Sequence, residues 1–181
     1  MSAKARENAR NTYKFTRLVF SALEYHGLVP VVSQRVVASL ALNISTAIDL
    51  VCVMNPHRHA KNAKCDNAND DENASAAKPR LCLVELKCGF LGDRSASVRK
   101  FKLGIDAADS CYNRHFAQLA CTRELFLKES ALLKTLRSPE DFGMHNNVLG
   151  FLLYVNDTDT ELLPLPLWWQ TRGTELLAKI R

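Results

Sequence analysis

Two short apolar runs carry charged residues where a buried strand would ordinarily carry none. Residues 46–53 contain Asp49, and residues 80–87 contain Glu85 and Lys87. Carboxylates and ammonium groups are rarely buried without a partner or a metal ion, because removing them from water is costly. Two runs that break this rule in the same way predict a site.

The chemistry open to these three residues follows from the geometry of strands. Residues two apart point to the same face, so Glu85 and Lys87 project side by side, and Asp49 can join them from the neighbouring strand. Two converging carboxylates form a hard, oxygen-rich site suited to Mg²⁺ or Mn²⁺. A lysine beside them can orient or help to deprotonate a metal-bound water. Together with a basic groove, this set describes phosphodiester hydrolysis.

Length and composition predict a single domain over residues 1–181. The chain is 47% hydrophobic and 24% charged, and no apolar run approaches the roughly 18 residues of a membrane helix, so we expect no membrane partner. The net charge of +5 suits a polyanionic partner without requiring one. Six cysteines without a CxxC pair or a secretory signal indicate an intracellular protein, nuclear or cytoplasmic. The basic N-terminal segment leaves a mitochondrial transit peptide as an alternative.

Hydrophobic spacing gives the elements that must position the site. We expect a helix over residues 8–26, extended structure over 28–32 and 35–42, the two charged strands, and a long helix over about 105–133. A strand over 147–155, an extended edge over 161–169 and a short helix over 171–181 complete a mixed α/β layer fold. Residues 60–79 contain no aliphatic side chain larger than Ala. We therefore expect a flexible insertion over about 55–79, between two strands that remain neighbours in space.

The long helix carries a second line of residues beside its apolar stripe. Cys111, His115, Gln118 and Thr122 recur at helical spacing, and this mostly polar line borders the core. The order of elements resembles the PD-(D/E)xK nuclease superfamily: an N-terminal helix is followed by a strand that carries Asp49 and by a strand that carries the Glu-x-Lys of Glu85 and Lys87. The Gln-bearing helix is similar to that of its RecB and lambda exonuclease branch. The resemblance covers roughly residues 12–155 and implies a restriction-endonuclease-like, three-layer fold with a mixed central β-sheet flanked by helices.

The resemblance implies a Mg²⁺-dependent (or Mn²⁺-dependent) deoxyribonuclease that hydrolyses DNA with a metal-activated water, in recombination, repair or viral DNA processing. Asp49 and Glu85 would be metal ligands, and the carbonyl of Leu86 would complete the metal shell. Lys87 would position the nucleophilic water, and Gln118 would be a supporting group.

The chain departs from the motif at one position and offers two candidates for an additional acidic residue. Ile48 stands where the motif's name has Pro, which is its loosest position. The family often adds an acidic residue on its first helix, for which Glu24 is the candidate, although helical geometry puts it nearly opposite the apolar stripe. Glu7 is a weaker alternative.

A basic patch after the Glu-x-Lys strand is the candidate for phosphate contacts, and it comprises Arg94, Arg99, Lys100 and Lys102. In the lambda exonuclease branch, basic residues near this site can hold a terminal phosphate. His115 is a further candidate for DNA contact, and a polar residue at a helix boundary is its plainer interpretation.

Other interpretations stay open beside the enzyme. The charged residues could be an ordinary ion pair of a protein adaptor, or part of a catalytically inactive nuclease-fold module that binds nucleic acid or a protein partner. His57, His59 and Cys65 fit no standard zinc finger, and the scattered cysteines argue against an iron–sulfur cluster. Trp168 and Trp169 predict core and edge packing, and an exposed Trp there would mark a surface for a homo-oligomer.

Overall fold

The structure is a computed structural model, and it describes residues 13–54, 79–88, 105–128, 148–156 and 159–180. In chain order its elements are helix α2 (Lys14–Tyr25), strands β1 (Leu28–Ser39), β2 (Ile44–Met54) and β3 (Arg80–Cys88), helix α4 (Cys111–Lys128), strands β4 (Leu149–Val155) and β5 (Thr160–Pro164), and helices α6 (Leu167–Gln170) and α7 (Gly173–Lys179).

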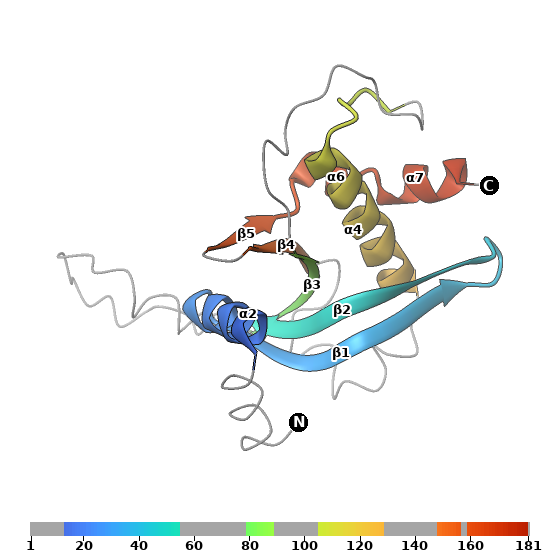
Figure 1. The fold of residues 1–181 in the computed structure, drawn as a ribbon. Helices are drawn as coiled ribbons and strands as arrows, with labels where there is room; N and C mark the ends of the chain where they lie inside the picture. Colours follow the sequence, from blue (N-terminus) through green and yellow to red (C-terminus); the bar gives the residue numbers. More distant parts are fainter. Residues whose placement is uncertain (1–12, 55–78, 89–104, 129–147, 157–158, 181) are drawn as a thin grey trace, which may run out of the picture.

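The strands form one mixed sheet in the order β1-β2-β3-β4-β5. The first three strands pair antiparallel, β4 runs parallel to β3, and β5 returns antiparallel to β4. The parallel step requires a crossover connection, and α4 lies within it. Helix α2 covers one face of the sheet, whereas α4, α6 and α7 lie on the other (Figure 1). This arrangement confirms the expected α/β class and the mixed sheet flanked by helices.

The alternation of side chains along β2 and β3 divides the core into two clusters. One cluster packs between the sheet and α2 and includes Leu23 of that helix with Cys52, Cys82 and Val84 of the strands. The other packs between the sheet and α4, and its buried members include Val51, Leu81, Leu83, Leu119 and Phe126. Among the described residues, no helix is long and apolar enough to cross a membrane.

Helix α2 ends where the sequence predicts. Gly27 has a φ of 65°, a left-handed conformation that glycine adopts without steric cost, and its N–H donates to the carbonyl of Glu24. Residues 8–12 of the expected helix lie outside the described residues.

Helix α4 begins at Cys111, so the prediction of a helix from residue 105 is wrong. Ile105 is buried in the core, but it belongs to an irregular segment in which the N–H of Ala107 donates to the carbonyl of Ile105. Ser110 acts as the N-cap of the helix, because its hydroxyl accepts a hydrogen bond from the N–H of Asn113 at 3.2 Å and so caps the first turn.

Two further boundaries differ from the prediction. β1 is a single edge strand over residues 28–39, with its pairing shifted between Pro30 and Val32, rather than two extended pieces. The expected extended edge over 161–169 is wrong in its second half, because β5 ends at Pro164 and residues 167–170 form α6. The strands on either side of the predicted insertion do pair, from Leu50 opposite Val84 to Met54 opposite Arg80.

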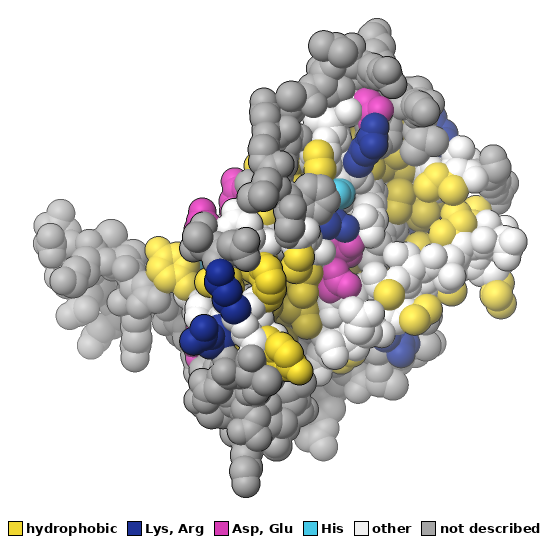
Figure 2. Space-filling model, in the orientation of Figure 1, with side chains coloured by type: hydrophobic (Ala, Val, Ile, Leu, Met, Phe, Trp, Pro, Cys, Tyr) yellow, Lys and Arg dark blue, Asp and Glu magenta, His cyan; other side chains and the backbone are white. Residues whose placement is uncertain are grey.

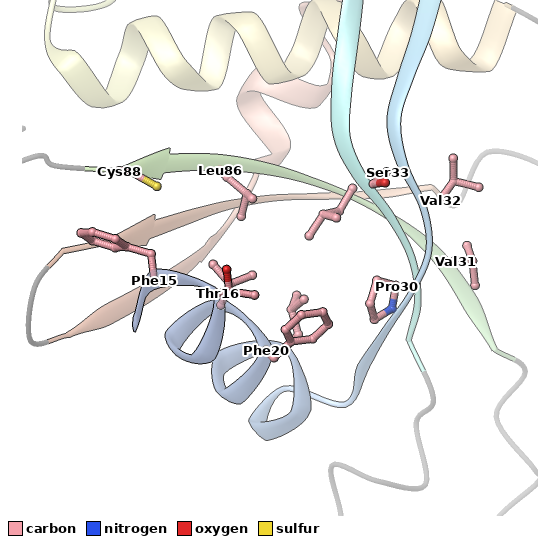
Figure 3. Close-up of a pocket in the computed structure, with 12 residues that line it drawn as sticks. Phe15, Thr16, Phe20, Pro30, Val31, Val32, Ser33, Leu86 and Cys88 are labelled. Atoms are coloured by element: carbon pink, nitrogen blue, oxygen red, sulfur yellow. The ribbon is translucent and has the colours of Figure 1, made fainter. Parts of the chain in front are cut away.

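An apolar pocket of about 420 Å³ lies on the α2 face of the sheet. Phe15 and Phe20 of α2 line one side, and Pro30, Leu50 and Leu86 of the strands line the other. Figure 3 shows the helix residues pointing toward the strands across this space.

Candidate active site

The two charged strands meet at the point where their pairing ends. The last paired positions are Leu50 and Val84, so Asp49 and Glu85 are the next positions along the two strands. Beyond that point the N–H of Leu86 donates to Oδ2 of Asp49 at 2.9 Å. The carboxylate of Asp49 therefore satisfies a backbone donor of β3 and is fixed beside the segment that carries Glu85 and Lys87.

Three side chains form a closed ring of hydrogen bonds next to Asp49. Oε1 of Glu85 accepts from Nζ of Lys87 at 2.7 Å and from Nε2 of Gln118 at 2.7 Å. Lys87 also donates to Oε1 of Gln118 at 3.0 Å. Because each member bonds to the other two, β3 and α4 hold one another in a defined position here. The structure thus brings Gln118 of the polar helix line to the Glu-x-Lys strand.

The environment of Glu85 disfavours the charged form of its carboxyl group. The residue is 5% exposed, and burial raises the pKa of its carboxyl group, with the charge of Asp49 adding to that rise. The hydrogen bond and charge of Lys87, and the hydrogen bond from Gln118, lower this pKa but do not cancel the effect of burial. A cation placed between the two carboxylates would relieve both the desolvation and their mutual repulsion.

Charged side chains and a histidine follow one another in a narrow band near the centre of this face of the molecule, between apolar areas (Figure 2). His115 lies one turn before Gln118 on α4, and its Nδ1 is 2.8 Å from the hydroxyl of Tyr154. Burial first, and then the charges of Lys87 and Arg114, lower the pKa of His115 to about 4. The imidazole is therefore neutral at pH 7 and is held against β4.

A residue that sequence reasoning missed also contacts the site. Nε2 of Gln34, on β1, donates to Oδ1 of Asp49 at 3.2 Å. No signal in the sequence marks Gln34, because its proximity to Asp49 depends on the register between β1 and β2.

Several predicted residues are not brought to these side chains. Glu24 is an exposed residue in the last turn of α2, which packs on the opposite face of the sheet, so the structure gives no support to Glu24 as an acidic ligand. The remaining candidates lie outside the described residues. They are Glu7, the basic patch of Arg94, Arg99, Lys100 and Lys102, and the zinc candidates His57, His59 and Cys65. Among the described residues, no group of three or more His, Cys, Asp or Glu side chains could hold a metal ion.

The two tryptophans differ in burial. Trp169 is buried in the α4 cluster, whereas Trp168 is 36% exposed and its ring lies 3.9 Å beneath the guanidinium of Arg172. The exposed ring thus has a cation–π partner within the chain.

Comparison with the known protein families, with curated proteins and with solved structures finds no match for this chain.

Proposed function

We propose that this protein is a metal-dependent deoxyribonuclease of the PD-(D/E)xK superfamily, with a restriction-endonuclease-like fold, closest to the RecB and lambda exonuclease branch. One observation carries the proposal. Asp49, Glu85, Lys87 and Gln118 come from β2, β3 and α4, and a continuous set of hydrogen bonds joins the last three while Asp49 is anchored to the backbone between Glu85 and Lys87. The fold supports it through a mixed sheet between helices, with an Asp strand followed by a Glu-x-Lys strand and then a Gln-bearing helix.

The donor set suits a hard divalent cation. The two carboxylates that would bind it belong to Asp49 and Glu85, and the carbonyl of Leu86 lies between the two residues of the Glu-x-Lys pair. The raised pKa of Glu85 supports the same assignment, because a site that resists a second negative charge gains most from a cation. When bound there, Mg²⁺ or Mn²⁺ would supply the Lewis acid that activates water and polarises the phosphate.

The side chains of the protein would perform the remaining tasks. Lys87 holds an ammonium group 2.7 Å from Glu85, where it could orient a water molecule and offset charge that develops on the phosphate. Gln118 limits the conformations of Lys87 by accepting one of its hydrogen bonds. Asp49 keeps a fixed orientation because a backbone N–H holds Oδ2.

The test is incubation of the purified protein with linear double-stranded, linear single-stranded and circular DNA, in Mg²⁺, in Mn²⁺ and in EDTA. We expect cleavage that requires the metal, and the three substrates separate exonuclease from endonuclease activity. Glu85→Gln, purified in parallel, controls for nucleases carried over from the expression host. Cleavage by Glu85→Gln at the wild-type rate would exclude this site.

Binding without turnover is the contrasting outcome. If the folded wild-type protein binds DNA but cuts none of the substrates in either metal, the inactive nuclease-fold module is the correct alternative. Circular dichroism of each preparation shows whether an inactive sample is folded.

A further inference from the structure

Gln34 has a backbone conformation that its side chain does not favour. Its φ is 54°, in the left-handed region that long side chains rarely adopt. It lies in β1 between Ser33, which pairs with Leu50, and Arg35, which pairs with Ile48, so it stands opposite Asp49. A non-glycine residue persists in such a conformation only where the surrounding structure holds it there, and such residues cluster at functional sites.

Both strands change the face they present at this one place. On β2, Ile48 and Val51 are three residues apart, yet both are buried in the cluster beneath α4. On β1, Val32 and Val37 are five residues apart, and both contact that same cluster. Strict alternation would put the two members of each pair on opposite faces. The alternation therefore breaks at Gln34 on one strand and near Asp49 on the other.

The break brings a side-chain amide to a carboxylate. Nε2 of Gln34 donates to Oδ1 of Asp49 at 3.2 Å, while the N–H of Leu86 donates to Oδ2 at 2.9 Å. The carboxylate is thus held from β1 on one side and from β3 on the other. Each oxygen has two lone pairs, so each can still accept a further partner.

We propose that Gln34 is a positioning residue that fixes the carboxylate of Asp49 for metal binding, and that its left-handed backbone brings its amide to that carboxylate. The proposal rests on the proposed metal-dependent nuclease. It adds a residue of β1, the edge strand, to a site otherwise built from β2, β3 and α4. Partners that orient a ligand in this way commonly change metal affinity by about 10- to 100-fold when removed.

Two variants separate the amide from the backbone. Gln34→Gly removes the amide and is compatible with a φ of 54°, and Gln34→Asn tolerates that φ but carries its amide on a side chain one methylene shorter. We expect both variants to fold, with the melting temperature of Gln34→Gly equal to or above that of the wild type. The Mg²⁺ concentration that gives half-maximal cleavage should rise about 10-fold in both, at the lower end of the range because the bond is exposed.

Asn43→Gly is the matched control. Asn43 has a φ of 52°, almost the same as that of Gln34, but it lies in the turn between β1 and β2 at the far end of the hairpin. The same relief of backbone strain should leave the Mg²⁺ dependence of cleavage unchanged there. An equal loss in Asn43→Gly would mean that a loosened hairpin, rather than the missing amide, causes the effect, and would overturn the proposal.

Calorimetric titration of each protein with Mg²⁺ alone gives a second measurement without DNA. We expect an affinity about 10-fold weaker in Gln34→Gly than in the wild type. If the wild type cleaves and binds Mg²⁺ but Gln34→Gly and Gln34→Asn match it in both assays, the role of Gln34 is refuted and the nuclease stands. If the wild type neither binds the metal nor cleaves, both proposals are refuted.

Discussion

The two faces of β2 and β3 offer opposite chemistry from the same short stretches of chain. Toward α4, Glu85 and Lys87 form a polar ring with Gln118. Toward α2, Leu50 and Leu86 line an apolar pocket, and Leu86 is labelled on its wall in Figure 3. Each leucine is the direct sequence neighbour of a candidate site residue. Adjacent residues of the same strand therefore carry a carboxylate on one face and a pocket-lining leucine on the other.

This contrast shows how a sheet can place charge at the edge of a core. Alternation keeps the carboxylate and ammonium groups on one face, where α4 supplies the amide that satisfies them. Burial in the two core clusters, one on each face, holds the strands together. We therefore expect substitutions in the polar ring to act on chemistry and substitutions of the apolar residues on the α2 face to act on stability, and the following predictions test that division.

The largest effect should come from the polar ring. Lys87→Ala and Glu85→Gln should lower the rate of metal-dependent DNA cleavage by at least about 10²- to 10³-fold, because each removes a charge that the proposed mechanism uses to stabilise the reacting phosphate or the metal. Steady-state cleavage of linear DNA measures this. The matched control is the pair of Glu175 and Lys179 on α7, which has the same 2.7 Å separation but exposed side chains. Glu175→Gln and Lys179→Ala should cleave as the wild type does, and an equal loss there would contradict the assignment.

The next effect belongs to the opposite face. Leu23 of α2 is 1% exposed, so Leu23→Ala should lower the free energy of unfolding by about 2–5 kcal/mol through lost burial and the cavity left behind. Urea denaturation measures the loss. Leu40→Ala, at a side chain that is 97% exposed, is the control and should change stability by less than about 0.5 kcal/mol.

The division also predicts what Leu23→Ala leaves intact. Under conditions in which the variant remains folded, its rate of cleavage per folded molecule should equal that of the wild type. A large loss of cleavage in the folded variant would show that α2 contributes to the site on the other face.

A smaller effect is expected from protonation beside the ring. The pKa of His115 falls from 6.5 to about 4 on folding, so the unfolded chain binds a proton between these values while the folded protein does not. Stability should therefore be lost as the pH falls from about 6.5 to about 4. The loss attributable to His115 should be about 1–2 kcal/mol, because solvent screens a group that is only partly buried.

His115→Gln isolates this contribution. The difference between the wild-type and variant unfolding free energies, measured from pH 4 to pH 8, should change across that window and be flat above it. The difference is needed because Glu85, whose pKa is raised, acts with the opposite sign: its contribution to stability is greatest when it is protonated and falls as the pH rises from about 4.5. A flat difference curve would show that His115 titrates as it does in the unfolded chain.

The parts of the site that the sequence predicts are those in which each residue carries its own signal. Asp49, Glu85 and Lys87 stand out as charges within apolar runs, and Gln118 stands out on a polar line at helical spacing. Their convergence then follows from two strands that pair and a helix that packs over them. Nothing comparable marks Gln34, since its contact requires a shifted register and a left-handed backbone that most residues avoid.

The errors in the fold have a similar cause. Ile105 continues the apolar spacing of α4 and is buried, so periodicity alone places the helix start too early. The cap at Ser110 is a local signal for the true start, and it is weaker in the sequence than the apolar stripe. The pocket on the α2 face could not be predicted, because it depends on the angle at which a helix crosses a sheet rather than on any one residue.

The smallest effect is the sharpest test of the two-face division. Leu50 follows Asp49 directly and lines the apolar pocket. A volume-conserving change of Leu50 therefore alters the pocket wall next to the proposed metal-binding carboxylate. Leu50→Met should lower the free energy of unfolding by less than about 1.5 kcal/mol, because methionine refills most of the space. Cleavage should stay near the wild-type rate, since the orientation of Asp49 depends on the N–H of Leu86 and the amide of Gln34 rather than on the Leu50 side chain. A loss of cleavage approaching that of Glu85→Gln would mean that packing beneath the sheet sets the position of the carboxylate, and the two faces would then act as one.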